Sequence, residues 1–204
     1  MQILDTVIDT QVIERSEFIA ILKRCFSIAQ AKQIVEKVMV EYPNATHYCY
    51  AYLLANNQFS KSNDNGEPSG TAGSPILQVL LKNELDNVIC VVVRYFGGIK
   101  LGAGGLIRAY SSSAANAVNK ATLTNFIPWH IFSFNASYDQ LGIVNNLVND
   151  HFKIVDTQYS DNVTFTIHTT IDLTEVKPML DNALKQDVKL DINDDLLIET
   201  PIEK

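Results

Sequence analysis

Long apolar segments are missing from this chain of 204 residues. Its longest apolar run, residues 88–93, has the length of a β-strand, whereas a membrane-spanning helix needs about 18 or more apolar residues. Residues 1–5 carry neither the basic start nor the apolar stretch of a secretory signal. We therefore expect a soluble, cytoplasmic protein with no membrane partner.

Cysteine is also scarce. The three cysteines, Cys25, Cys49 and Cys90, are widely spaced, have apolar or aromatic neighbours and form no Cys-x-x-Cys pair. Their odd number argues against a disulfide framework, and no basic neighbour is placed to lower the pKa of a catalytic thiol. We interpret all three as reduced, buried side chains.

Basic residues are few in the second part of the chain. The formal net charge is −7, and residues 1–129 contain 11 basic and 10 acidic residues, whereas residues 130–204 contain 5 basic and 13 acidic ones. An acidic region is poorly suited to phosphate backbones, so nucleic acid, if bound, should contact the first part. The hydrophobic share of 47% excludes a disordered chain.

The motifs of familiar nucleotide-binding proteins and hydrolases are missing. G-x-G-x-x-G would need a glycine where Ile107 stands, and G-x-x-x-x-G-K-[ST], G-x-S-x-G and H-E-x-x-H do not occur. His130, His151 and His168 are scattered without metal-ligand spacing. We therefore expect no cofactor, no metal site and no catalytic residue, and an enzyme is the less favoured class.

Hydrophobic periodicity in the first part predicts a mixture of strands and helices. Ser27 precedes one helical stretch, which Pro43-Asn44 ends, and Ser74-Pro75 supplies a second helix start, an N-cap followed by proline at the first helical position. The expected elements are strands at 6–13, 16–22, 46–53 and 87–95, helices at 27–42, 74–82 and 106–121, and loops at 60–73 and 97–105.

A change of pattern near residues 125–128 predicts a boundary between a domain at 1–127 and a domain at 128–204. The second domain shows the βαββαβ order of ferredoxin-like folds, so the fold class is α+β. Its expected elements are strands at 130–138, 153–159, 163–173 and 188–198, and helices at 141–152 and 175–186.

Residues 94–108 form a glycine-rich segment between a strong strand and a helix. Such density favours backbone with positive φ or close backbone approach, and successive N–H groups before a helix bind anions. Arg94, Lys100 and Arg108 lie in or beside it, although the chain has only four arginines. A tight turn and an anion-binding surface are equally compatible with the spacing. Its glycines are Gly97, Gly98, Gly102, Gly104 and Gly105.

A second polar segment, residues 63–73, carries two carboxylates, Asp64 and Glu67. They are candidates for a general acid/base pair or for Mg²⁺ ligands, but the same residue types also form structural turns, and a partner-binding surface is a third interpretation. His47, in an aromatic strand, is more typical of packing than of catalysis. The remaining polar and glycine positions of the segment are Gly66, Ser69, Gly70, Thr71 and Gly73.

Three segments together resemble the IMPACT family in its bacterial, two-domain branch. They are residues 43–47 (PNATH), 62–73 (SNDNGEPSGTAG) and 94–110 (RYFGGIKLGAGGLIRAY). The resemblance covers about residues 1–125, with weaker signals beyond. It implies an N-terminal α/β sandwich similar to domain IV of elongation factor G and a ferredoxin-like second domain similar to its domain V. Eukaryotic relatives carry an additional N-terminal module and restrain a kinase pathway that stops translation in starvation.

The resemblance favours a non-enzymatic, translation-associated factor. Its first domain would bind RNA, the ribosome or a translation-related protein, without DNA sequence specificity. The alternatives are a small hydrolase of a phosphorylated substrate, using Asp64, Glu67 and the glycine loop, and a protein-binding module without nucleic-acid contact. The expected binding surface comprises His47, Asp64, Glu67, Ser69, Thr71, Arg94, Tyr95, Lys100, Arg108 and Tyr110, and the expected loop-forming residues are Gly66, Gly70, Gly73, Gly97, Gly98, Gly102, Gly104 and Gly105.

Overall fold

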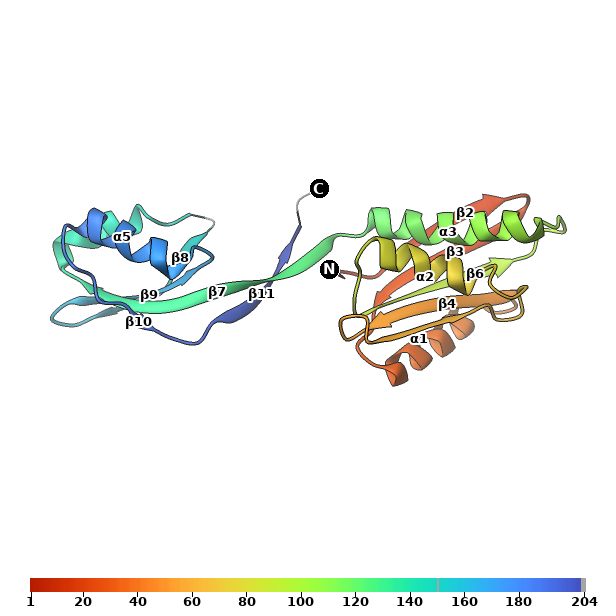
Figure 1. Ribbon diagram of the computed structural model, residues 1–204, viewed down its shortest axis with the longest axis horizontal. Helices are drawn as coiled ribbons and strands as arrows, with labels where there is room; N and C mark the ends of the chain where they lie inside the picture. Colours follow the sequence, from red (N-terminus) through yellow and green to blue (C-terminus); the bar gives the residue numbers. More distant parts are fainter. Residues whose placement is uncertain (150, 203–204) are drawn as a thin grey trace. The chain divides into compact units, whose positions relative to one another are not determined.

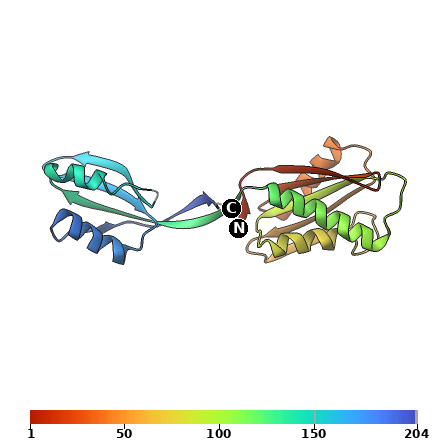
Figure 2. The same cartoon turned by 90° about the horizontal axis from the view of Figure 1, so that it is seen from above.

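The computed structural model describes residues 1–149 and 151–202. The chain divides into two compact units, residues 1–125 with Pro201 and Ile202, and residues 126–200 (Figures 1 and 2). Among the described residues, no helix is both long and apolar enough to cross a membrane. Each unit has a hydrophobic core of its own, so the two are described separately.

The first unit is built on an antiparallel five-stranded sheet whose strands lie in the order β2-β3-β6-β4-β5. The central strand is β6, whose run of β-branched residues is buried on both faces, as strand propensity and burial together favour. The strand bounds are β2 (Val7–Ile13), β3 (Ser16–Arg24), β4 (His47–Leu54), β5 (Phe59–Asn63) and β6 (Val88–Tyr95).

Helices cover both faces of this sheet. Helix α1 (Ile28–Glu41) packs on one face, while α2 (Gly73–Lys82) and α3 (Gly102–Lys120) lie side by side on the other (Figures 1 and 2). Side chains alternate across the strands, so that Phe18 and Val92 join the core under α2 and α3, and Ile19 and Val93 join the core under α1. The sheet is therefore the middle layer of three.

Three sequence predictions for the first unit were wrong in detail. The expected loop at 60–73 contains β5, an edge strand whose mostly polar side chains hide the strand period while its backbone pairs with β4. Helix α2 starts at Gly73 rather than Ser74, and no side chain of Ala72 or Ser74 caps it. Helix α3 starts at Gly102 rather than residue 106, because low glycine propensity masks its first turn. Consequently Gly73, Gly102, Gly104 and Gly105 lie in helices rather than loops.

The second unit has the predicted βαββαβ order of elements and an antiparallel sheet in the order β10-β7-β9-β8. Its core joins phenylalanines of the strands to aliphatic residues of the second helix, as with Phe132, Phe165 and Leu180. The elements are β7 (Leu123–Ala136), α4 (Leu141–Asn145) after the 3₁₀ turn η1 (Tyr138–Gln140), β8 (Phe152–Tyr159), β9 (Val163–Thr169), α5 (Leu173–Leu184) and β10 (Asp191–Ile192).

The limits of several elements in this region differ from the predictions. Strand β7 passes through residues 125–128 without a break, and its first residues pair with β1 (Gln2–Ile3). The helix expected at 141–152 is the much shorter α4, and its residue 150 lies outside the described part. The strand expected at 188–198 is replaced by β10 and β11 (Leu196–Pro201), because Asn193, Asp194 and Asp195 interrupt it.

A candidate ligand-binding cleft

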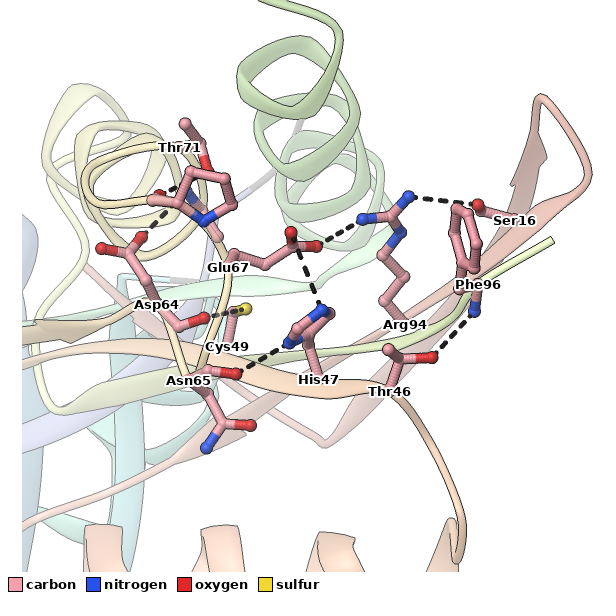
Figure 3. A network of polar contacts seen from close by, with 12 residues as sticks. Ser16, Thr46, His47, Cys49, Asp64, Asn65, Glu67, Thr71, Arg94 and Phe96 are labelled. Atoms are coloured by element: carbon pink, nitrogen blue, oxygen red, sulfur yellow. Dashed lines mark hydrogen bonds and ion pairs between the residues drawn. The ribbon is translucent and has the colours of Figure 1, made fainter. Parts of the chain in front are cut away.

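The two polar segments singled out in the sequence meet in one cleft of the first unit, with a volume of about 360 Å³. Its walls come from the start of β4, the turn before α2, the end of β6 and the start of α3. Figure 3 shows this region, in which the Glu67 carboxylate lies between the side chains of His47 and Arg94. The lining residues are Thr46, His47, Glu67, Pro68, Arg94, Phe96, Lys100, Leu101, Gly102, Ala103 and Leu106.

Asp64 lies beside the cleft and closes the N-terminus of α2. Its Oδ1 accepts hydrogen bonds from the backbone N–H groups of Ala72 (3.0 Å) and Gly73 (2.8 Å), and its Oδ2 accepts one from Gly70 (2.9 Å). Burial alone would raise the pKa of Asp64, but these three bonds stabilise the carboxylate and hold the pKa below its usual value. Asp64 therefore does for α2 what an N-cap side chain ordinarily does.

Glu67 is the centre of a buried polar network. Its Oε1 accepts hydrogen bonds from Arg94 Nη1 (2.6 Å) and from the Tyr110 hydroxyl of α3 (2.7 Å). The side chains of Glu67 and Arg94 are only 4% and 5% exposed, so each charge depends on the other for compensation. Burial, together with Cys49 and Glu67 nearby, raises the pKa of Tyr110 and keeps its hydroxyl a donor. The network joins the turn before α2, the end of β6 and the middle of α3.

The Arg94 guanidinium lies over two aromatic rings, those of Phe18 and Phe96. Its Cζ is 5.3 Å from the centre of the Phe18 ring and 5.4 Å from that of Phe96, distances at which a cation is attracted to the ring face. Its Nη2 donates to Ser16 Oγ, which also accepts the Gly97 N–H. Phe18 is fully buried, whereas 46% of Phe96 remains exposed beside the cleft. Arg94 is therefore a fixed wall of the cleft rather than a mobile surface charge.

The ring orientation of His47 follows from its partners. Nδ1 lies 2.8 Å from the backbone oxygen of Asn65, which can only accept, so Nδ1 carries a proton. In the neutral ring Nε2 is then the acceptor, and it lies 3.8 Å from Glu67 Oε2, too far for a hydrogen bond. Glu67 Oε2 makes no hydrogen bond with any described residue. With a neutral His47 ring, the floor of the cleft thus presents two acceptors, Glu67 Oε2 and His47 Nε2, to which no described residue donates.

The start of α3 forms the opposite side of the cleft. Gly97 permits this path, because a Cβ at that position would lie 1.9 Å from the backbone oxygen of Arg15. Gly102 has φ of +67° at the helix start, and no side chain caps the first turn of α3. The first backbone N–H groups of a helix have no partners within the helix. Lys100 and Arg108 are exposed on this side and form no ion pair with the described residues.

The structure separates the predicted site residues into three groups. His47, Glu67, Arg94 and Lys100 line the cleft, and Tyr110 supports it from behind. Arg108 lies in a neighbouring groove with Lys100, and Ser69 is exposed. Asp64, Thr71 and Tyr95 instead bond to backbone atoms: Thr71 Oγ1 donates to the oxygen of Pro68 and the Tyr95 hydroxyl to that of Pro43.

The sequence did not indicate several residues that line the cleft or contact Arg94 behind it. Ser16 and Phe18 belong to a distant strand, and no local spacing connects them with Arg94. Phe96, Leu101 and Leu106 lie within the glycine-rich segment, where the glycines and cations are the more prominent pattern and the apolar residues show no periodicity. The position of Phe96 directly before Gly97 and Gly98 was the one feature of the sequence that could have indicated an aromatic residue at the cleft.

The three cysteines of the described residues, Cys25, Cys49 and Cys90, are free thiols and are buried. Cys49 donates from Sγ to the backbone oxygen of Asp64, and burial raises the pKa of Cys49 to about 12. Burial likewise raises the pKa of Cys90 to about 12. Both thiols are therefore protonated at neutral pH and contribute packing rather than nucleophilic chemistry, as the sequence indicated.

Comparison with known proteins places the chain in a family. The family model for the Impact N-terminal domain matches residues 14–118, a range that contains the whole cleft. YvyE of Bacillus subtilis (strain 168), an IMPACT family member, is 45% identical over 156 residues, covering 76% of this chain and 72% of YvyE. YigZ of Escherichia coli (strain K12) is 36% identical over 151 residues, covering 72% and 74%. This chain belongs to the IMPACT family, and the predicted resemblance is confirmed.

Among solved structures, one described as a hypothetical protein aligns with 92% of this chain and 94% of its own, at 30% identity and a TM-score of 0.58. The mixed α and β architecture with two sheets is therefore shared with a solved relative over nearly the whole chain. A chain described as the two-domain translational regulator Yih1 aligns with 57% of this chain and 45% of its own, at 25% identity and a TM-score of 0.33.

Proposed function

We propose that this protein is a non-enzymatic, translation-associated factor whose first unit binds RNA, with the cleft and the start of α3 as the contact surface. The observation that carries the proposal is the uncapped start of α3, with Lys100 inside and Arg108 beside the same segment. Exposed backbone N–H groups and cations at a helix start attract phosphate.

An exposed aromatic ring lies next to these phosphate-binding groups. Arg94 lies over the Phe96 ring, and 46% of Phe96 remains exposed, which leaves ring surface available for stacking. Stacking on aromatic rings combined with backbone contacts to cations is how proteins bind single-stranded RNA. The charge distribution agrees, since residues 1–129 have a slight excess of basic residues and residues 130–204 a strong excess of acidic ones.

The same proposal includes a structural correspondence with elongation factor G. The first unit would correspond to its domain IV and the second, with its βαββαβ order, to its domain V, as a ferredoxin-like domain. A ribosome or a translation-related protein offers RNA-like and protein surfaces together, and both are outcomes that the experiment below distinguishes.

The hydrolase alternative needs Asp64 and Glu67 as a proton-transfer pair. Asp64 is fixed by three backbone N–H groups at the start of α2, and Glu67 compensates the buried Arg94. Both carboxylates are therefore engaged in structural contacts, and the binding role accounts better for the geometry.

Fluorescence anisotropy with single-stranded RNA tests the proposal. We expect binding to weaken steeply as salt rises from about 50 mM to about 200 mM, because phosphate contacts release counterions. The double variant Lys100→Ala, Arg108→Ala should bind more weakly. Its salt slope should also be smaller, by about one for each phosphate that the variant no longer binds.

The matched control is Lys32→Ala, Lys37→Ala, which removes two exposed cations from α1 on the opposite face of the sheet. It should bind RNA as the unmodified protein does. Co-sedimentation with ribosomes before and after nuclease treatment separates RNA contact from protein contact. Absence of RNA and ribosome binding at low salt, or equal weakening in both double variants, would overturn the proposal.

A further inference from the structure

The cleft floor has an unusual complement of hydrogen-bonding atoms. Glu67 Oε2 belongs to a side chain that is 96% buried, as its 4% exposure shows, yet it makes no hydrogen bond with a described residue. When the His47 ring is neutral, its Nε2 adds an acceptor at 3.8 Å from that oxygen, because Nδ1 carries the proton. Two neighbouring acceptors that face the cleft fit a ligand with two neighbouring donors, because each donor would then find a partner.

A cationic ligand does not fit this floor well. The Glu67 charge is already compensated by Arg94 at 2.6 Å, and Lys100 adds a further positive charge at the rim. A lysine or arginine side chain would therefore enter a region with excess positive charge. The ligand's donors must belong to a neutral group.

The walls of the cleft fit a flat ring. Pro68, Leu101, Leu106 and the exposed face of Phe96 are apolar or aromatic, and the volume of about 360 Å³ is at the small end of ligand sites. The rim carries Lys100 and the uncapped N-terminus of α3, which suit a phosphate. A phosphate at the rim, a ring between the walls and two donors at the floor together describe one nucleotide.

We infer that the cleft binds a single unpaired guanine nucleotide, which names the base recognised within the proposed RNA-binding function and rests on it. Guanine presents N1–H and the N2 amino group as adjacent donors on its Watson–Crick edge. Adenine and cytosine present one donor group beside an acceptor, and uracil one donor between two acceptors. Guanine alone matches both acceptors, with N1–H donating to Glu67 Oε2 and the N2 amino group to His47 Nε2. Its ring then stacks on Phe96 and its phosphate contacts the start of α3.

The test uses the unmodified protein and three short oligouridines that carry one central guanosine, inosine or adenosine. Inosine lacks only the N2 amino group of guanosine. Anisotropy at low salt should show roughly tenfold or more tighter binding of the guanosine RNA than of either other RNA, since a correct bidentate contact discriminates by that amount or more. His47→Phe should bring the guanosine-to-inosine ratio close to one, whereas Lys32→Ala should retain it.

Failures of the two proposals give different results. Equal, salt-dependent affinity for all three RNAs would overturn the guanine inference and leave RNA binding in place. Guanosine monophosphate, used as a competitor and as a direct ligand by calorimetry, distinguishes a free nucleotide from RNA. If it binds while no RNA does, the guanine site stands and the RNA function fails. A guanosine preference that survives in His47→Phe would overturn the assigned floor contacts.

Discussion

Two helices of the first unit begin near the same cleft, but their N-termini are completed differently. The start of α2 is closed by Asp64, which occupies three backbone N–H groups of the segment leading into it. The start of α3 has no capping side chain and carries Lys100 just before it. Where the protein's own carboxylate accepts from the first N–H groups of a helix, that helix end contributes to stability. We call the start of α3, whose first N–H groups have no such partner, the open end, and it is available to bind an anionic ligand.

Glu67 connects these two helix ends, and removing it should have the largest effect. It lies in the turn that leads to α2 and bonds to Tyr110 of α3, while it compensates the buried Arg94. We expect Glu67→Ala to lower the free energy of unfolding by about 3–5 kcal/mol, because an unpaired buried charge remains. Urea denaturation measures this.

The control for that prediction is Glu36→Ala, which breaks the exposed Lys32–Glu36 pair of α1. This change should alter the free energy of unfolding by about 0.5 kcal/mol or less. If the two variants lose similar stability, the Glu67–Arg94 pair does not hold the cleft together.

Opening the closed end should have the next largest effect. Asp64→Asn should lower the free energy of unfolding by about 1–2 kcal/mol at neutral pH, because a carboxylate that accepts from three N–H groups is replaced by a neutral amide. The folded pKa of Asp64 lies below its unfolded value, so its contribution is complete above the unfolded pKa, about 3.9, and disappears as pH falls through the folded pKa. The difference between the two proteins should therefore shrink on acidification below about pH 4. A difference that stays constant down to about pH 2 would show that the carboxylate charge has no role.

Placing a carboxylate at the open end tests the comparison most directly. Ala103 is the second residue of α3 and is exposed, and Ser74 is the exposed second residue of α2. Ala103→Asp should lower RNA affinity about fivefold, since the new charge occupies the N–H groups and repels phosphate. The matched Ser74→Asp should leave affinity unchanged. Equal losses of affinity in the two variants would mean that RNA responds to overall charge rather than to the start of α3.

The sequence predicted the segments of the site better than it predicted their contacts. Strand β6 and helix α1 follow from uninterrupted periodicity, and the two polar segments were identified because glycine, carboxylate and arginine are concentrated there. The hydrogen bonds of Glu67 with Arg94 and Tyr110 could not be predicted from local sequence patterns, because these residues are 27 and 43 positions away from Glu67. Their pairing depends on the order of strands in the sheet and on the path of α3.

The elements that were missed share a physical cause. Strand β5 is held by backbone pairing with β4 at an exposed edge, so its polar side chains carry no hydrophobic period. The first turn of α3 contains three glycines, which disfavour a helix intrinsically but leave its N–H groups open. The glycines at the start of α3, which caused the wrong prediction of where the helix begins, are also the residues whose open N–H groups the proposed function uses.

The smallest effect concerns the thiol behind the closed end. Cys49 donates to the backbone oxygen of Asp64, and with its pKa raised to about 12 it is a protonated thiol at neutral pH. Iodoacetamide should therefore label Cys49 no faster than fully buried Cys90 in the native protein, as read by mass spectrometry of peptides. Asp64→Asn should accelerate labelling of Cys49 alone, because only that thiol lies under the loosened turn. Equal acceleration at Cys90 would instead report global unfolding, and the closed end would then not be a local structural unit.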